Sequence, residues 1–232
     1  MKTILAIETS TDIASVALFH QGVLKTTQLS GVNTHSHGLL PAIDDLLSEF
    51  AIDVSQIERL AFGCGPGAFT GVRTACGVVQ GLAFALDLPV LPLVSLHVQA
   101  QAAREQHGID ECVCLLDARM SEVYWTHLKW DGSAWQEVTV ANLSTLPELI
   151  PYLSQQVCPI VFGSNIPFEG ETNLKSLHAM PHAAQAISLA MHAPDSACVR
   201  AEDAQPLYLR NKVALTTAER LLAARGTNAA LV

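Results

Sequence analysis

The sequence has few charged residues, and basic residues are the scarcer kind. Lysine and arginine total 13 against 22 acidic residues in a chain of 232, which gives a formal net charge of -9. A protein that wraps nucleic acid by itself needs a basic face to neutralise phosphates. The composition therefore excludes that class for the isolated chain, and any RNA would have to be held mostly by a partner.

Paired cysteine spacing is missing as well. The six cysteines lie apart among apolar neighbours, without the CxxC pairs that are typical of structural zinc sites. They are Cys64, Cys76, Cys112, Cys114, Cys158 and Cys198. We therefore expect reduced, buried thiols and no bound metal.

The sequence also lacks a long hydrophobic segment of the membrane-spanning kind. Glu8 comes too early for the apolar region of a signal peptide. The apolar run at residues 74–86 falls short of the roughly 20 residues needed to cross a bilayer. Because 50% of the residues are hydrophobic, we expect a folded protein with an extensive core, located in the cytoplasm.

Glycine and proline are concentrated in one stretch, residues 63–68, which we call the glycine turn. It follows an apolar strand and precedes a helix predicted at residues 69–86. The turn lacks the GK[ST] ending of a P-loop, and Thr70 stands where a dinucleotide fingerprint requires its last glycine. We favour a purely structural turn over one that binds phosphate directly.

The helix after this turn contains Gly71, Gly77 and Gly81. Each glycine costs about 1 kcal/mol relative to alanine inside a helix. Gly77 and Gly81 are four residues apart on one face, where small residues let another backbone approach closely. Two alternatives stay open: a neighbour within the chain, or a bundle in which this helix and the predicted helix 39–50 pack against a second chain.

The order of predicted elements repeats once along the chain. Three strands open the first half and are followed by helix, strand, helix, strand and helix, and three strands open the second half again. The predicted strands are 4–7, 14–19, 23–29, 57–62, 89–94, 111–116, 123–128, 135–140 and 159–163, and the predicted helices are 39–50, 69–86, 95–106, 146–153 and 183–191. Ser95 is expected to cap the third helix. We divide the chain into an N-terminal lobe (1–107), a C-terminal lobe (108–215) and a tail (216–232).

Other chemical motifs are weak. His35 and His37 are two residues apart and diverge on a helix, and Leu39 stands where a second ligand four residues after His35 is needed. Asp117 and Arg119 are interpreted as a structural ion pair. GxSxG, HExxH and a cysteine in an activating setting are all absent from the sequence, so a hydrolase is poorly supported.

Four segments, taken together and in order, resemble a known family. They are ILAIETS at 4–10, GPGAFTGVR at 65–73, DARMSEVYW at 117–125 and PLYLR at 206–210. Their combination resembles the TsaB (YeaZ) family of bacterial tRNA threonylcarbamoyladenosine biosynthesis proteins. The resemblance implies a two-lobed α/β fold of the actin-like ATPase type (the sugar kinase, Hsp70 and actin superfamily), with a mixed sheet and flanking helices in each lobe.

The resemblance also implies a role without independent catalysis. Proteins of this kind pair with the paralogue TsaD, which carries ATP and the catalytic metal, and with the ATPase TsaE. Together they transfer a threonylcarbamoyl group to the adenosine 3′ of the anticodon in tRNAs that read codons beginning with adenine. The chain itself is expected to be no enzyme, to require no cofactor, to meet tRNA only within the complex, and to form a homodimer through the same surface when TsaD is absent.

Two sets of residues are candidates under this hypothesis. The partner surface on the first two helices would contain Leu39, Ile43, Leu47, Val72, Cys76, Gly77 and Gly81. The family turns, where a residual nucleotide contact would lie, contain Glu8, Thr9, Ser10, Gly65, Gly67, Gly71, Arg73, Asp117 and Arg119.

The sequence departs from active relatives at three points. Glu8 replaces the aspartate usual in this family, the bulky Arg119 obstructs close approach of phosphate, and the HxxxH metal pattern of TsaD is absent. The main rival function is a self-sufficient small-molecule kinase or ATPase of the same fold, with the glycine turn lining its cleft. A peptidase is a weaker alternative, since no nucleophile and base are assembled in the sequence.

Overall fold

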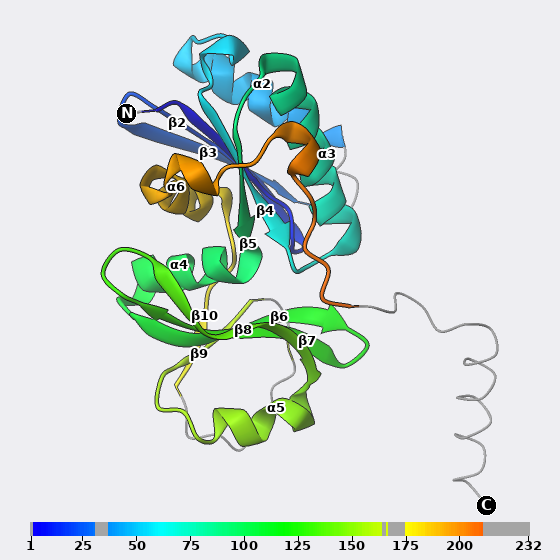
Figure 1. Cartoon of the computed structure of the whole chain (residues 1–232), viewed down its shortest axis with the longest axis vertical. Helices are drawn as coiled ribbons and strands as arrows, with labels where there is room; N and C mark the ends of the chain where they lie inside the picture. The colour runs from blue at the N-terminus through cyan, green and yellow to red at the C-terminus, as the bar shows by residue number, and fades with distance from the viewer. Residues whose placement is uncertain (1, 31–36, 164–165, 167–174, 211–232) are drawn as a thin grey trace, which may run out of the picture.

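The structure is a computed structural model that describes residues 2–30, 37–163, 166 and 175–210. It contains two five-stranded mixed sheets, one in each half of the elongated molecule (Figure 1). The first sheet, in the order β3-β2-β1-β4-β5, consists of β1 (Ile4–Glu8), β2 (Ile13–His20), β3 (Val23–Ser30), β4 (Arg59–Gly65) and β5 (Val90–Val94). The second, in the order β10-β9-β6-β7-β8, consists of β6 (Glu111–Arg119), β7 (Glu122–Trp130), β8 (Trp135–Thr145), β9 (Ile160–Phe162) and β10 (Ser176–His178). The predicted tail 216–232 and His35 lie outside the described residues.

The second sheet repeats the topology of the first. β1–β2 and β2–β3 pair antiparallel, as do β6–β7 and β7–β8. β1–β4 and β4–β5 pair parallel, as do β6–β9 and β9–β10. The predicted two-lobed α/β architecture, with a three-strand opening in each half, is confirmed.

Five α-helices flank the sheets within the described residues. They are α2 (Leu39–Phe50), α3 (Phe69–Leu86), α4 (Ser95–His107), α5 (Leu146–Leu153) and α6 (Ala183–His192). Short 3-10 helices cover Val54–Gln56, Asp195–Ala197 and Ala201–Asp203. α2 buries Leu39, Ala42, Ile43, Leu46 and Leu47, the spacing of an amphipathic helix on a core.

Local chemistry differs from the prediction at a few points. Ser95 does not cap α4, because Val94 occupies the cap position and the Ser95 hydroxyl instead donates to Glu8 Oε2 at 3.1 Å. β6 runs on to Arg119 rather than ending near residue 116. β10 and the 3-10 helices were not predicted, since elements of three residues carry no usable periodicity.

Helix α6 belongs to the second half of the sequence but covers the first sheet (Figure 1). Its residues Ala186 and Ile187 pack in one core cluster with Ile4 and Ala6 of β1. Further on, the backbones of Val90 and Val199 exchange two hydrogen bonds, at 3.0 and 2.7 Å. The division of the chain between residues 107 and 108 stays a prediction. The contacts of α6 and Val199 show that the chain returns to the first lobe after completing the second sheet.

Helix α3 is apolar on more than its buried side. Among the described residues it is the one helix long and apolar enough to cross a membrane by length and composition, a test that buried core helices also pass. Val72, Ala75 and Val79 face the first sheet, yet only 33% of the helix is buried. An apolar helix normally has cover on all sides, so the outer face of α3 lacks a neighbour within the described chain.

Candidate functional site

The glycine turn is fitted against the loop that follows β1. A Cβ on Gly67 would lie 2.2 Å from the carbonyl oxygen of Ser10, and one on Gly71 would lie 2.0 Å from that of Thr9. The Thr9 hydroxyl donates to the Gly71 carbonyl at 2.7 Å, and the Ala68 amide donates to the Ser10 carbonyl at 2.6 Å. These glycines are therefore required by a close contact between two backbone segments, which is the structural role that the sequence favoured.

Glu8 lies under this loop and does not face the cleft. Its side chain is fully buried, where Oε1 accepts from the Ser10 amide at 2.7 Å. The carboxyl group occupies the space that a side chain at residue 63 would take, since a Cβ on Gly63 would lie 1.9 Å from Oε2. Burial raises the pKa of Glu8 because the charged form is poorly solvated there. The prediction that Glu8 offers a nucleotide contact is corrected, because the residue is buried in the core.

A cavity of about 230 Å³ lies between the lobes, beside the loop after β1, the amino end of α3 and the turn after β6. Residues from four segments line it: Ser10, Thr11 and Asp12; Gly67, Ala68, Phe69 and Val72; Leu116, Asp117, Ala118, Arg119, Met120 and Tyr124; and Leu207, Tyr208, Leu209 and Arg210. Ser10 Oγ is buried and has no hydrogen-bond partner among the described residues.

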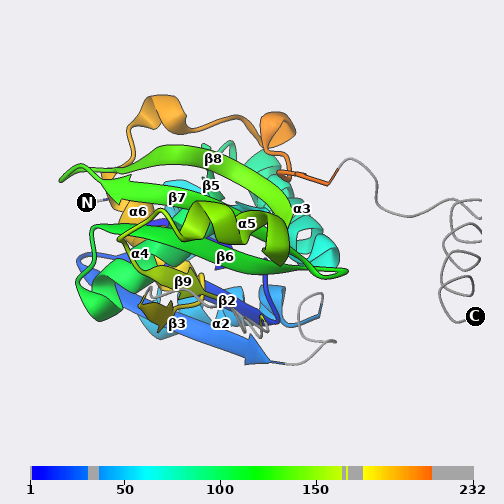
Figure 2. The same ribbon diagram turned by 90° about the horizontal axis from the view of Figure 1, so that it is seen from below.

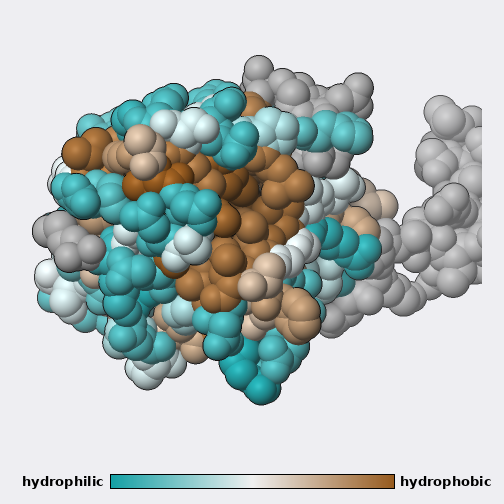
Figure 3. All heavy atoms as spheres, turned by 90° about the horizontal axis from the view of Figure 1, so that it is seen from above, coloured by the Kyte–Doolittle hydropathy of each residue, from teal (hydrophilic) through white to brown (hydrophobic). Residues whose placement is uncertain are grey.

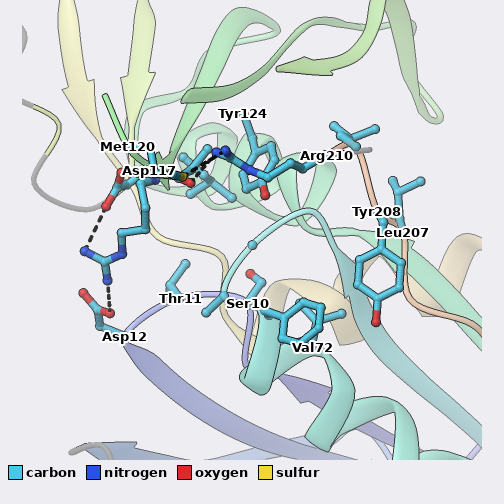
Figure 4. Close-up of a pocket in the computed structure, with 17 residues that line it drawn as sticks. Ser10, Thr11, Asp12, Val72, Asp117, Met120, Tyr124, Leu207, Tyr208 and Arg210 are labelled. Carbon is cyan, nitrogen blue, oxygen red and sulfur yellow. Dashed lines mark hydrogen bonds and ion pairs between the residues drawn. The ribbon is translucent and has the colours of Figure 1, made fainter. Parts of the chain in front are cut away.

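Arg119 bridges the two sides of this cleft. Its guanidinium contacts Asp12 Oδ1 of the first lobe at 3.2 Å and Asp117 Oδ2 of its own lobe at 3.0 Å. Figure 4 shows Asp12 and Asp117 joined through this guanidinium by dashed lines. The Arg119 amide donates to Asp117 Oδ1 at 2.8 Å, so the backbone group that an incoming phosphate would need already has a partner.

Arg73 and Arg210 are held by neighbours at the same cleft. The guanidinium of Arg73 stacks on the ring of Phe69, 3.6 Å from its centre, and its Nε donates to the Tyr208 hydroxyl at 2.6 Å. Arg210 forms an ion pair with Glu122, and its guanidinium donates to the Ala118 carbonyl at 3.0 Å. Four of the nine predicted motif residues, Ser10, Gly67, Asp117 and Arg119, line this cavity. The other five, Glu8, Thr9, Gly65, Gly71 and Arg73, do not line it.

The partner surface predicted on α2 and α3 requires a correction. Five of its seven residues are at most 7% exposed and pack in the core of the first lobe. They are Leu39, Ile43, Leu47, Val72 and Cys76. A side chain that is buried within its own chain is unavailable to a partner, and periodicity alone does not tell the inner face of a helix from the outer one.

Gly77 and Gly81 differ from these five residues. Both are exposed, and a Cβ on either would meet nothing within 4 Å. With Phe84, which is 85% exposed, and the exposed Ala85 they form one stripe along α3, which we call the open face. On α2, Leu40 is 58% exposed. Figure 3 shows a hydrophobic area on the side of the molecule that carries these two helices.

The thiols show no activation. Burial raises the pKa of Cys64 to about 12, with the nearby Glu8 carboxyl adding to the shift, and burial also raises the pKa of Cys158 to about 11. Among the described residues, one group combines the side chains that metals prefer: Glu111, His127 and Cys158. Its members are far apart in sequence, and for this reason the spacing of cysteines and histidines gave no signal for it.

Comparison with known proteins gives consistent matches over most of the chain. The family model described as "TsaD: tRNA N6-adenosine threonylcarbamoyltransferase" matches residues 23–225. The tRNA threonylcarbamoyladenosine biosynthesis protein TsaB of Haemophilus influenzae is 34% identical, covering 91% of this chain and 94% of that protein. TsaB of Escherichia coli is also 34% identical, covering 91% and 96%. The solved structure of YeaZ from Pseudomonas aeruginosa superposes with a TM-score of 0.79 at 35% identity, covering 90% of this chain and all of that one.

Proposed function

The chain belongs to the TsaB (YeaZ) family of tRNA threonylcarbamoyladenosine biosynthesis proteins, and from this premise we propose that it is a non-catalytic subunit that pairs with TsaD. In this proposal TsaD carries ATP and the catalytic metal, and TsaE completes the assembly. The complex transfers the threonylcarbamoyl group to the adenosine 3′ of the anticodon in tRNAs that read codons beginning with adenine. The chain works in the cytoplasm, requires no cofactor, and meets tRNA only through the complex, in keeping with its net charge of -9.

The open face of α3 is the observation that carries this proposal. Gly77 and Gly81 forgo helix stability although no contact among the described residues needs a glycine there. A stripe of small residues flanked by an exposed phenylalanine lets a second helix approach closely and bury apolar surface. We therefore propose that the contact lies on the open face and includes the exposed Leu40 of α2. A second copy of the chain would use the same surface when TsaD is absent, so the two pairings exclude each other.

The cleft supports the non-catalytic part of the proposal. Arg119 occupies the space between Asp12 and Asp117, and the Arg119 amide is hydrogen-bonded. Glu8 is buried and, with its raised pKa, is a poor metal ligand. Catalysis of phosphoryl chemistry requires exposed donors and a metal aligned on the phosphates, and these residues are engaged elsewhere.

Replacing Gly81 by leucine tests the pairing. The substitution points into open space and should leave the monomer folded, but it blocks close approach of a helix. We expect Gly81→Leu and Gly77→Leu to abolish co-sedimentation with TsaD and to reduce tRNA modification in a depleted cell. Gln155→Leu is the matched control, because it adds the same side chain at an exposed position of the other lobe. Unchanged sedimentation of both glycine variants with TsaD would contradict the proposed surface.

A self-sufficient kinase or ATPase is the second candidate function. The cavity of about 230 Å³ between the lobes is the observation that favours it, since small-molecule ligands bind in clefts between lobes. Calorimetry with ATP and magnesium on the isolated chain separates the two functions. Tight binding with turnover would establish the kinase or ATPase, whereas we expect neither.

A further inference from the structure

A cluster of three metal-binding side chains lies in the second lobe, away from the cleft and from the open face. Glu111 opens β6, His127 lies on β7, and Cys158 comes just before β9. These three strands are neighbours in the sheet. α5 covers one face of the second sheet (Figure 2). The cluster lies on this face, where Cys158 belongs to the same core cluster as Val113 and Leu153.

The distances between the polar atoms match the edges of a metal coordination sphere. His127 Nε2 lies 3.1 Å from Glu111 Oε1 and 3.6 Å from Cys158 Sγ, and all three ligand atoms lie within 4.8 Å of one another. Zinc holds nitrogen and oxygen at about 2.0–2.2 Å and sulfur at about 2.3 Å in a tetrahedron. Ligands at those lengths are separated from each other by roughly 3.3–3.6 Å, so little movement would bring all three to one ion.

The arrangement differs from a catalytic triad. In a triad the histidine uses one ring nitrogen for the nucleophile and the other for the acid. Here Glu111 and Cys158 both face Nε2, while Nδ1 lies 2.8 Å from the Tyr152 hydroxyl. Two ligand groups that meet at one ring nitrogen can share a cation there. The Tyr152 hydroxyl at the other ring nitrogen would fix the orientation of the histidine that binds the metal.

The charges around the cluster also suit a divalent cation. Lys129 contacts Glu111 Oε2 at 2.9 Å, which leaves Oε1 directed at the histidine. His127 and Cys158 are at most 7% exposed, while the Glu111 side chain is 35% exposed. The cluster therefore opens to solvent on one side, where a water can complete a tetrahedron.

We propose that Glu111, His127 and Cys158 bind one zinc-like divalent cation that ties the β9, β6 and β7 strands together beneath α5. On binding, the Cys158 thiol loses its proton to solvent and becomes the thiolate ligand. The neutral His127 ring keeps its proton on Nδ1 and donates a hydrogen bond from there to the Tyr152 hydroxyl oxygen, so that Nε2 is free to bind the ion. The Glu111 carboxylate and the Cys158 thiolate, with one negative charge each, then balance the charge of the divalent cation.

Titration of the full chain with zinc alone tests this site. We expect one ion per chain, with a melting temperature that rises with zinc concentration because the ion binds only the folded state. Cys158→Ala and Glu111→Gln each remove a ligand and should weaken zinc binding by more than about 100-fold. Tyr152→Phe removes only the hydrogen bond that orients His127, so it should weaken zinc binding by about 10- to 100-fold. His97→Gln is the matched control, since His97 faces Glu137 at 2.9 Å without a nearby thiol among the described residues, and it should bind zinc like the original chain.

Cobalt in place of zinc gives a reading that does not depend on any variant. A sulfur ligand produces a thiolate-to-cobalt absorption band in the original chain, and this band should disappear in Cys158→Ala. Circular dichroism establishes that each variant is folded. Absence of the band in the original chain, or zinc affinity that survives both Cys158→Ala and Glu111→Gln, would overturn the site and indicate adventitious binding elsewhere.

Discussion

Glu8 illustrates how a polar motif residue can become part of the core. Its carboxyl group is fully buried, accepts hydrogen bonds from the Ser10 amide and the Ser95 hydroxyl, and covers Gly63. Burial is the main cause that raises the pKa of Glu8, and the hydrogen bonds offset only part of it. The folded protein therefore retains a proton at Glu8 at pH values where the unfolded chain has released it.

This difference gives a pH dependence with a definite sign. Below the ordinary glutamate pKa of about 4.3 both states are protonated, and the contribution of Glu8 to stability is fully present. It is lost as the pH rises from there through the raised pKa of the folded state, by at most about 1.4 kcal/mol per pH unit. Glutamine has nearly the same size and shape as glutamic acid but does not ionise. The free energy of unfolding of Glu8→Gln should therefore exceed that of the original chain at pH 8 and match it near pH 4.

Urea denaturation at the two pH values measures the effect. Asp53→Asn is a suitable comparison, because Asp53 is an exposed carboxylate whose pKa is lowered by the Ser55 hydroxyl and amide. That variant should lose the stabilising carboxylate above pH 4 and so shift in the opposite direction. A Glu8→Gln chain that is less stable than the original at pH 8 would contradict a raised pKa of Glu8.

At the scale of elements, α3 contains two kinds of glycine. A Cβ on Gly71 would lie 2.0 Å from the Thr9 carbonyl oxygen, a backbone atom that cannot swing away, whereas one on Gly77 would meet nothing. We expect Gly71→Ala to destabilise the chain by about 1 to 3 kcal/mol through overpacking. Gly77→Ala should stabilise it by up to about 1 kcal/mol through helix propensity.

The midpoint of urea unfolding compares these two variants directly, since both make the same substitution in the same helix. If Gly77→Ala were the more destabilising of the two, the close packing of the glycine turn against the loop after β1 would not be the reason for Gly71. The sign of the stability change in Gly77→Ala also bears on the proposed partner. If alanine stabilises the monomer, the glycine is explained by contact with another chain rather than by the stability of this one.

The helices could be predicted well from the sequence because their signals are local. The bounds of α2, α3 and α5 match the prediction, and α5 begins with a Thr145–Glu148 capping box. Orientation was not predictable in the same way. Leu39 and Cys76 were placed on the partner surface but face the core, because hydrophobic periodicity identifies an apolar face without saying what covers it.

The candidate sites depended on contacts that no local pattern contains. The meeting of the loop after β1, the glycine turn and residues 117–119 at one cleft follows from the resemblance and is seen in the structure. The Arg119–Asp12 bridge spans 107 residues and carries no signal in the spacing. Glu111 and His127 lie on β6 and β7, and Cys158 lies just before β9, so only the register of the second sheet brings the three residues together.

At the scale of the whole molecule, the two lobes are interdependent. α6 packs on β1, and Arg59 of β4 donates to the Ala190 carbonyl of α6 at 2.6 Å and forms an ion pair with Asp195. Between the sheets, α4 contributes Val98 to the core of the first lobe and Leu96 to that of the second. Neither half of the sequence contains a complete core.

A truncated chain tests this interdependence. Residues 1–107 lack α6 and the Val90–Val199 pairing, so one face of the first sheet loses its cover. We expect this fragment to show no cooperative urea transition by circular dichroism, while the full chain unfolds in one step. A cooperative transition in the fragment would mean that the N-terminal lobe folds by itself.

The return of α6 to the first sheet also bears on how the protein is made. The strands of the first sheet leave the ribosome early, but α6, which covers one face of them, is synthesised only after all five strands of the second sheet. Domains usually fold as units, with the N-terminal one first. If residues 1–107 do not fold alone, as predicted above, the face of the first sheet that α6 covers stays exposed until α6 has been synthesised.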